Sequence, residues 1–333
     1  MENNNIKSQF AGIELINPII ASSCSLTGSA KSNQMLSKAG VGAIVLKSLF
    51  EEDIIRESAA LSQASTHTEA ADYMQAYVAS NALSGYIDLI KESKSLCGST
   101  PIIASINCAN EGEWVEYARA IEAAGADALE LNVMTIESGF MSEDGELERR
   151  HIAIAKAVRE VVKLPLIMKL GQLMSNHISI ISRLEACGIN GFVLFNRAYP
   201  LDINIEDMSY THGAILSESN DLTAPLRHIA ITSAALPKAS LALSGGVQDG
   251  TCIIKSILAG ASAVEVCSTL YRNKESKTAE WIAHSLETIK AWQQRHGYDS
   301  VEEFRGIMNT KSDEYRDSVM RTQFLKHFGS YQL

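Results

Sequence analysis

The chain has 333 residues, of which 46% are hydrophobic and 20% charged, enough to bury one large core or two modest ones. A formal net charge of −10 argues against a nucleic-acid partner, which would need clustered lysine and arginine. The first residues contain no apolar signal segment, and no later run approaches the roughly 18 apolar residues of a membrane span. We therefore expect a cytoplasmic globular protein without membrane contact.

The six cysteines are widely separated and form no C-x-x-C pair. This spacing argues against a disulfide framework or an iron–sulfur cluster held by this chain, and favours small buried thiols in a reducing compartment. The eight histidines show neither H-x-H nor H-E-x-x-H spacing, so the sequence predicts no metal site.

Eight short apolar runs alternate with longer amphipathic stretches. Runs that are apolar on both faces are typical of parallel strands covered by helices. Three of the runs open with proline, which is tolerated at the first position of a strand. The predicted strands are residues 18–22, 43–47, 101–106, 128–133, 165–170, 191–195, 241–245 and 263–267.

The stretches between these runs have helical periodicity. In residues 111–125, one face of the predicted helix carries Trp114, Tyr117 and Ile121, and Gly125 ends it. The same helical pattern is found in residues 147–162, 174–188 and 249–260. A short turn commonly connects such a helix to the next apolar run.

Eight such units predict a (β/α)8 TIM barrel, with a doubly wound open sheet as the alternative. Residues 10–18 read as a small N-terminal hairpin that closes the bottom of the barrel. The long connections 49–80 and 197–224 are expected to be loops that cover substrate. We expect residues 1–333 to form a single domain, with residues 273–333 as a C-terminal helical extension.

The last two predicted strands are followed by candidate phosphate-binding loops. Gly245 and Gly246 follow the seventh run, and Cys267 and Ser268 follow or end the eighth. In barrels, these two loops donate backbone N–H groups to a phosphate, and glycine allows a close approach. The alternative is an ordinary tight turn at the two glycines.

Polar side chains at other strand ends suggest a planar ligand. Lys47 and Lys169 lie within or at the end of apolar runs, where an ammonium group needs a charged partner or ligand unless it points outward. A cation beside a flavin would stabilise its anionic reduced ring. Four amides are expected near the same face, namely Asn81, Asn107, Asn132 and Asn196.

Together these motifs resemble the class 1 dihydroorotate dehydrogenase family, including the related C-terminal part of dihydropyrimidine dehydrogenase. The matching pieces run through residues 8–272 and include "FAGIELINPIIASS", "IVLKS", "AGADALELN", "LPLIMKL", "FVLFNR", "LSGGVQDG" and "LAGASAVEVCSTLY". Members of that family are FMN-binding barrels. The order and spacing of the pieces, rather than any one of them, carry the resemblance.

The resemblance implies a role for each matching residue. Lys47 is implied to lie beside the flavin ring and to take part in catalysis, and Asn132 to contact both ring and substrate. Asn81 and Asn196 are implied to hold the polar edges of a pyrimidine. The full set of implied FMN-binding residues is Ala21, Ser22, Lys47, Ser48, Asn132, Lys169, Gly245, Gly246, Cys267 and Ser268.

The sequence departs from the family at the fourth predicted strand. The family motif Asn-Leu-Ser-Cys-Pro-Asn is here "NVMTIE", residues 132–137. Thr135 therefore occupies the position of the cysteine base, and Glu137 that of a substrate-binding asparagine. A thiol has a pKa of about 8.5, whereas a threonine hydroxyl is far less acidic and would have to relay the proton, for example to Glu137. Glu137 would also repel the carboxylate of orotate.

These expectations define an FMN-dependent oxidoreductase that acts on a CH–CH bond, transferring hydride to flavin N5. Its expected substrate is dihydroorotate or a related cyclic amide. One alternative is a flavin-binding homologue without turnover; another is a sugar-phosphate isomerase, for which no acid/base pair is evident at the strand ends. The resemblance also implies a homodimer, and leaves room for a separate iron–sulfur subunit.

Overall fold

The computed structural model describes residues 5–50, 68–108, 111–133, 143–197, 200–312 and 316. Eight parallel strands form a closed barrel, because β13 pairs with β3 and β4 pairs with β6. Each of the eight predicted runs coincides with one of these strands, with β6 extending one residue beyond its run, so the (β/α)8 prediction is confirmed. The strands are β3 Ile19–Ala21, β4 Ala43–Val45, β6 Ile102–Asn107, β7 Ala128–Asn132, β8 Leu166–Leu170, β9 Gly191–Leu194, β12 Leu241–Ser244 and β13 Ala263–Val266.

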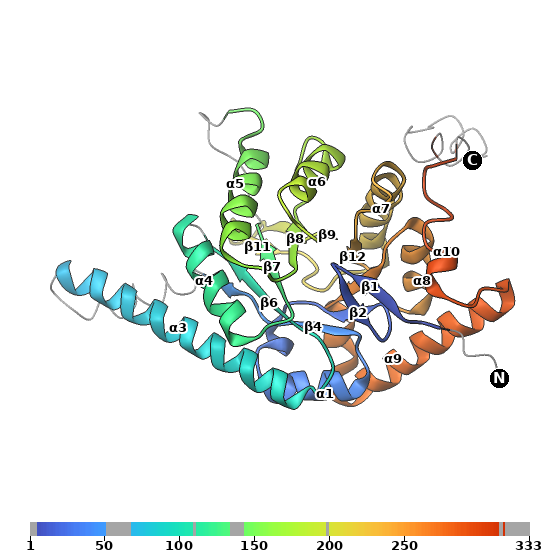
Figure 1. The fold of residues 1–333 in the computed structure, drawn as a ribbon, viewed down its shortest axis with the longest axis horizontal. Helices are drawn as coiled ribbons and strands as arrows, with labels where there is room; N and C mark the ends of the chain where they lie inside the picture. Colours follow the sequence, from blue (N-terminus) through green and yellow to red (C-terminus); the bar gives the residue numbers. More distant parts are fainter. Residues whose placement is uncertain are drawn as a thin grey trace.

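A helix follows each barrel strand, and Figure 1 shows α1 lying between α3 and α9 on the outside of the barrel. The helices are α1 Ala30–Ala39, α3 Thr68–Leu96, α4 Glu111–Ala124, α5 Glu146–Val161, α6 His177–Ala186, α7 Thr223–Ala235, α8 Gly250–Ala259 and α9 Ser268–His296. The short helix α10 (Val301–Phe304) and the 3-10 turns η1 (Ser25–Thr27) and η2 (Ser219–Leu222) complete the helical elements of the described chain. None of its helices is both long and apolar enough to cross a membrane.

Helix α4 illustrates how periodicity positions an element. Trp114, Tyr117 and Ile121 are buried on its barrel-facing side, as predicted. Gly125 follows with a φ of +86°, a left-handed conformation that glycine adopts without a Cβ penalty. The chain can therefore turn directly into β7.

The predicted N-terminal hairpin consists of β1 (Ser8–Phe10) and β2 (Ile13–Leu15) and closes the bottom of the barrel. Phe10, Ala11 and Leu15 are buried against an inner ring to which every barrel strand contributes. Burial of a side chain such as Phe10 contributes about 1.5–3 kcal/mol. The ring residues are Ile20, Ala43, Val45, Ile103, Ala128, Ile167, Val193, Ala242 and Ala263.

The two long connections differ from the predicted loops. Residues 68–80 are helical, because α3 already begins at Thr68. The second connection contains an antiparallel hairpin, β10 (Leu201–Asn204) and β11 (Ser209–His212), which was not predicted. The hairpin exposes several large apolar side chains, namely Leu201, Ile203, Ile205, Met208 and Tyr210.

Candidate active site

Two adjoining cavities lie at the carboxyl ends of the barrel strands, where (β/α)8 enzymes carry their active sites. The larger has a volume of about 740 Å³ and the smaller about 140 Å³. The larger volume lies within the range of roughly 300–1,000 Å³ that is typical of small-molecule sites. Both cavities are lined by Ser23, Lys169, Asn196, Arg197 and Cys267.

The smaller cavity brings together the two predicted phosphate loops. Gly245 and Gly246, with φ angles of +109° and +71°, line it with Cys267 and Ser268. Ser217 joins these loops: its Oγ accepts a hydrogen bond from Gly246 N at 3.3 Å and donates one to Ser268 Oγ at 3.0 Å. Ser217 was not predicted, because it lies in the long connection before α7.

The N-terminus of α9 opens onto this cavity without a side-chain cap. By contrast, α1, α6 and α8 are capped by the side chains of Ser29, Asn176 and Asp249. An uncapped helix N-terminus leaves backbone N–H groups and the positive end of the helix dipole available to an anion. The geometry of the smaller cavity therefore suits a phosphate group.

Two arginines hold the connection that carries Ser217. Arg197 donates hydrogen bonds to the carbonyl oxygens of Ile215 and Ala214, at 2.6 and 2.8 Å. Arg272 donates to the carbonyl oxygen of Ser217 at 2.7 Å. Both guanidinium groups therefore fix the backbone of this connection against the phosphate loops.

Amide and lysine side chains line the larger cavity, in agreement with their predicted location. Asn196 Nδ2 donates a hydrogen bond to Asn132 Oδ1 at 2.6 Å, and Asn107 lies on the same wall. Lys47 is exposed there, while its neighbour Ser48 is buried. These groups offer donors and acceptors to a planar ligand with several carbonyl and N–H groups.

Two predicted site residues, Asn81 and Ala21, are not among the described residues that line either cavity. Asn81 is exposed on α3. Ala21 is fully buried in β3, directly before Ser22, which lines the smaller cavity. Thr135 and Glu137 lie outside the described residues, so their predicted roles stay predictions.

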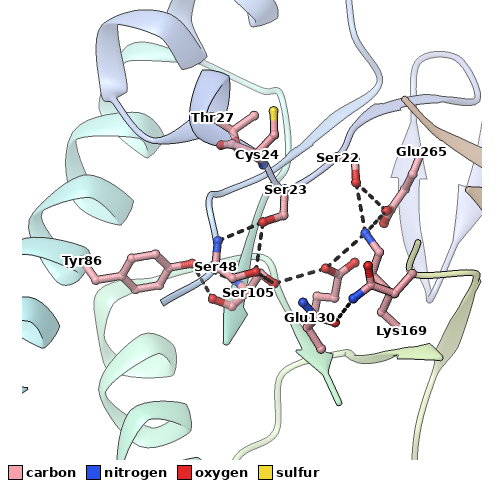
Figure 2. A network of polar contacts seen from close by, with 12 residues as sticks. Ser22, Ser23, Cys24, Thr27, Ser48, Tyr86, Ser105, Glu130, Lys169 and Glu265 are labelled. Carbon is pink, nitrogen blue, oxygen red and sulfur yellow. Dashed lines mark hydrogen bonds and ion pairs between the residues drawn. The ribbon is translucent and has the colours of Figure 1, made fainter. Parts of the chain in front are cut away.

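On the wall common to the two cavities, Lys169 has the charged partners that its burial requires. Its Nζ lies 2.6 Å from Glu265 Oε2 and 3.8 Å from Glu130 Oε1, and it donates to Ser22 Oγ at 3.0 Å (Figure 2). Ser105 Oγ in turn donates to Glu130 Oε1 at 3.2 Å. The two glutamates were missed, since each is a single charged residue within an otherwise apolar strand.

A chain of hydroxyl groups connects this charged cluster to the larger cavity. Ser105 Oγ lies 2.8 Å from Ser48 Oγ, which lies 3.0 Å from Ser23 Oγ. Ser23 and Ser48 both line the larger cavity, and Figure 2 shows the contacts that join them to Ser105. The polar interior of the barrel is therefore continuous with the site above it.

Cys24 and Cys267 form a thiol pair on the wall of the larger cavity. A hydrogen bond from Cys267 lowers the pKa of the Cys24 thiol to about 6, although burial acts in the opposite direction. The same bond and burial raise the pKa of Cys267. Cys24 is therefore the thiol of this pair that ionises first.

We expect alkylation of Cys24 by iodoacetamide to reach half its maximal rate near pH 6, because the thiolate is the nucleophile. Peptide mass spectrometry over a pH series measures this rate. Cys97 provides an internal comparison, since burial raises its pKa and should delay its alkylation to higher pH. Replacement Cys267→Ala should shift the Cys24 midpoint upward. A midpoint near the ordinary value of about 8.5 in the unsubstituted chain would contradict the pairing.

Comparison with known proteins assigns the chain to a family. A family model described as dihydroorotate dehydrogenase matches residues 5–289. The chain belongs to the dihydroorotate dehydrogenase family. The resemblance inferred from the sequence motifs is thereby confirmed, and with it the assignment of the chain as an oxidoreductase of a flavin-dependent family.

Relatives within the family cover the chain to different extents. The catalytic subunit of dihydroorotate dehydrogenase B (NAD(+)) from Thermoplasma volcanium is 25% identical over 316 residues, which span 91% of this chain and 98% of the relative. The corresponding subunit from Bacillus pumilus is 28% identical over 217 residues, 62% of this chain and 66% of the relative. The Thermoplasma match therefore relates nearly the whole barrel to a dihydroorotate dehydrogenase family member.

Proposed function

We propose that the protein binds FMN across the two cavities and oxidises a CH–CH bond next to a carbonyl group, with dihydroorotate as the first candidate substrate. The observation that carries this proposal is that the smaller cavity, lined by Gly245, Gly246 and Ser268, adjoins the larger cavity, which is lined by amide side chains. Family membership supports the same chemistry.

The residues present fit FMN. A Cβ at Gly246 would overlap the backbone of Asp221 and Leu222, so this loop can pack against that segment only with glycine at this position. We propose that the Gly246 N–H group exchanges its 3.3 Å hydrogen bond to Ser217 Oγ for one to the phosphate, which the N–H groups at the start of α9 also hold. We further propose that Lys47, Asn132 and Lys169 border the ring. Bound FMN would supply a two-electron acceptor at N5.

The protein's own part in the reaction is to position the substrate and remove a proton. Asn132 and Asn196 are proposed to orient the polar edges of a cyclic amide, since their side chains are coupled at 2.6 Å on the wall of the larger cavity. Thr135 is proposed to pass the proton to Glu137 or to water, because its hydroxyl is too weakly acidic to act as a thiol would.

Adding dihydroorotate anaerobically to the FMN-loaded protein is expected to bleach the visible flavin spectrum. A spectrum that stays unchanged with dihydroorotate but bleaches with another reduced cyclic amide would move the assignment to that substrate. If none of these compounds bleaches the flavin, the homologue without turnover becomes the correct description. A photoreduced sample serves as the reference for full bleaching.

The isomerase alternative is not favoured. The structure does contain a pair of buried carboxyl groups, but Glu130 is not among the described residues that line either cavity, and Glu265, which lines the smaller one, is paired with the Lys169 ammonium at 2.6 Å. An isomerase would need two carboxyl groups that are free to exchange protons with its substrate. The homodimer and the separate iron–sulfur subunit stay predictions from the family resemblance.

A further inference from the structure

Two carboxyl groups surround one ammonium group in the barrel interior. The side chains of Glu130, Lys169 and Glu265 are 0%, 7% and 1% exposed. If both carboxyl groups were ionised, the cluster would bury a net negative charge, which is costly in a low-dielectric interior. Their hydrogen bonds indicate how the cluster avoids this cost.

The two carboxyl groups have different hydrogen-bond partners. Glu265 Oε2 accepts from Lys169 Nζ at 2.6 Å and from Ser22 Oγ at 2.9 Å, the environment of an ionised carboxylate. Glu130 Oε1 accepts from Ser105 Oγ at 3.2 Å, whereas its buried Oε2 has no hydrogen-bond partner within the described part of the chain. A carboxyl group in that position incurs a smaller desolvation penalty if it is protonated and neutral than if it is ionised.

The electrostatic surroundings support the same distribution of charge. Burial and the neighbouring Glu265 raise the pKa of Glu130 well above its usual value. Burial also acts to raise the pKa of Glu265, but the Lys169 ammonium and hydrogen bonds outweigh it and lower that pKa. The cluster therefore consists of a neutral Glu130, an anionic Glu265 and a cationic Lys169, with a net charge of zero.

We propose that Glu265 is the counter-ion of Lys169 at the flavin site and keeps the midpoint potential of the bound flavin lower than an unpaired lysine would. This inference rests on the proposed function, because it requires the flavin ring next to Lys169, which lines both cavities. A lone cation would stabilise the anionic reduced ring. A carboxylate 2.6 Å away turns that cation into a local dipole, whose effect on the ring falls off faster with distance.

This charge pairing affects how readily the flavin is reduced. A lower potential leaves a smaller fraction of flavin reduced at equilibrium with a given CH–CH donor, and favours transfer of electrons onward from the reduced cofactor. Glu265 is thus a tuning residue that acts through Lys169, and it is not a group that exchanges protons with substrate.

The midpoint potential of the FMN-loaded protein, measured by anaerobic titration against a reference dye, tests the proposal. Glu130→Gln replaces a neutral acid by a neutral amide and should leave the potential unchanged. The double variant Glu130→Gln/Glu265→Gln leaves Lys169 without either carboxylate. At a fixed solution potential we expect its ratio of reduced to oxidised flavin to rise about tenfold, which corresponds to about 30 mV. The midpoint potential of Glu265→Gln alone should lie between those of the two other variants, because Glu130 lies near enough to Lys169 to ionise in place of Glu265.

Two results would overturn the proposal: a double variant with a midpoint potential equal to or below that of the unsubstituted protein, or a shift of the midpoint potential in Glu130→Gln as large as that in the double variant.

Infrared difference spectra of the flavin-free protein provide a second measurement. A protonated-carboxyl C=O band at neutral pH should be present in the unsubstituted chain and absent from Glu130→Gln. If that band is missing although FMN binds, the charge assignment is wrong. A chain that shows the band but takes up no FMN would instead refute the proposed function, and with it the role at the flavin.

Discussion

Replacement of Gly246 by alanine is expected to weaken FMN binding by about 10-fold to more than 100-fold. Gly246 has a φ of +71°, and an added Cβ would overlap the backbone of Asp221 and Leu222. The loop would have to shift, which would displace its N–H groups from the proposed phosphate position and remove charge-assisted hydrogen bonds worth roughly 1.5–3 kcal/mol each. Loss of one or two such bonds weakens binding by about 10-fold to more than 100-fold. Flavin fluorescence quenching measures the effect.

A matched glycine separates this effect from backbone strain. Gly297 also has a positive φ of +75°, but a Cβ there would meet no atom within 4 Å, and it follows the far end of α9. Gly297→Ala should therefore lower the free energy of unfolding by roughly 1–3 kcal/mol and leave FMN affinity unchanged. If Gly246→Ala binds FMN as well as Gly297→Ala does, the phosphate site is not at this loop.

Replacement of Lys169 by methionine is expected to destabilise the fold strongly at neutral pH. The substitution leaves Glu265 buried as an anion without the ammonium 2.6 Å away. Removing one partner of a buried ion pair costs on the order of 3–5 kcal/mol. Urea denaturation at several pH values measures this loss, and Lys169→Met/Glu265→Gln should recover most of it because no unpaired charge then stays buried.

The pH dependence of that loss has a definite sign. In the unsubstituted protein the pKa of Glu265 is lowered, so its contribution to stability is present above the pKa of an unfolded glutamate and is lost as the pH falls through the folded value. In Lys169→Met the lowering cation is gone and burial should raise that pKa instead. The variant should therefore gain stability relative to the unsubstituted protein as the pH falls. A destabilisation that is independent of pH would contradict the paired charges.

The barrel was predictable because its signals are local. Each strand is an apolar run, each helix repeats its buried positions every three or four residues, and Gly245 and Gly246 follow a strand directly. The helical start of α3 also had a local signal, since residues 68–80 are rich in helix-forming alanine, glutamate, methionine and glutamine. The β10–β11 hairpin had a weaker local signal, the alternation of Leu201 and Ile203 with polar residues before a turn at residues 205–208.

The charged cluster could not be predicted in the same way. Glu130 and Glu265 are separated along the chain by 135 positions, and only closure of the barrel brings β13 round to β7 and β8. Each glutamate lies in an apolar strand, and the sequence does not indicate whether its side chain faces the barrel interior or the helices. Ser217 could not be predicted for a related reason: its contacts with Gly246 and Ser268 depend on the conformation of the long connection 197–224.

Comparison of FMN with riboflavin tests the central claim most directly. The two flavins share the ring and the ribityl chain, so their difference in affinity isolates the phosphate and its proposed site at Gly245, Gly246 and the start of α9. Fluorescence-quenching titrations of the flavin-free protein should show that FMN binds at least about 100-fold more tightly than riboflavin, as expected for two or more charge-assisted hydrogen bonds. Equal affinity for the two flavins, or no binding of either, would contradict the account.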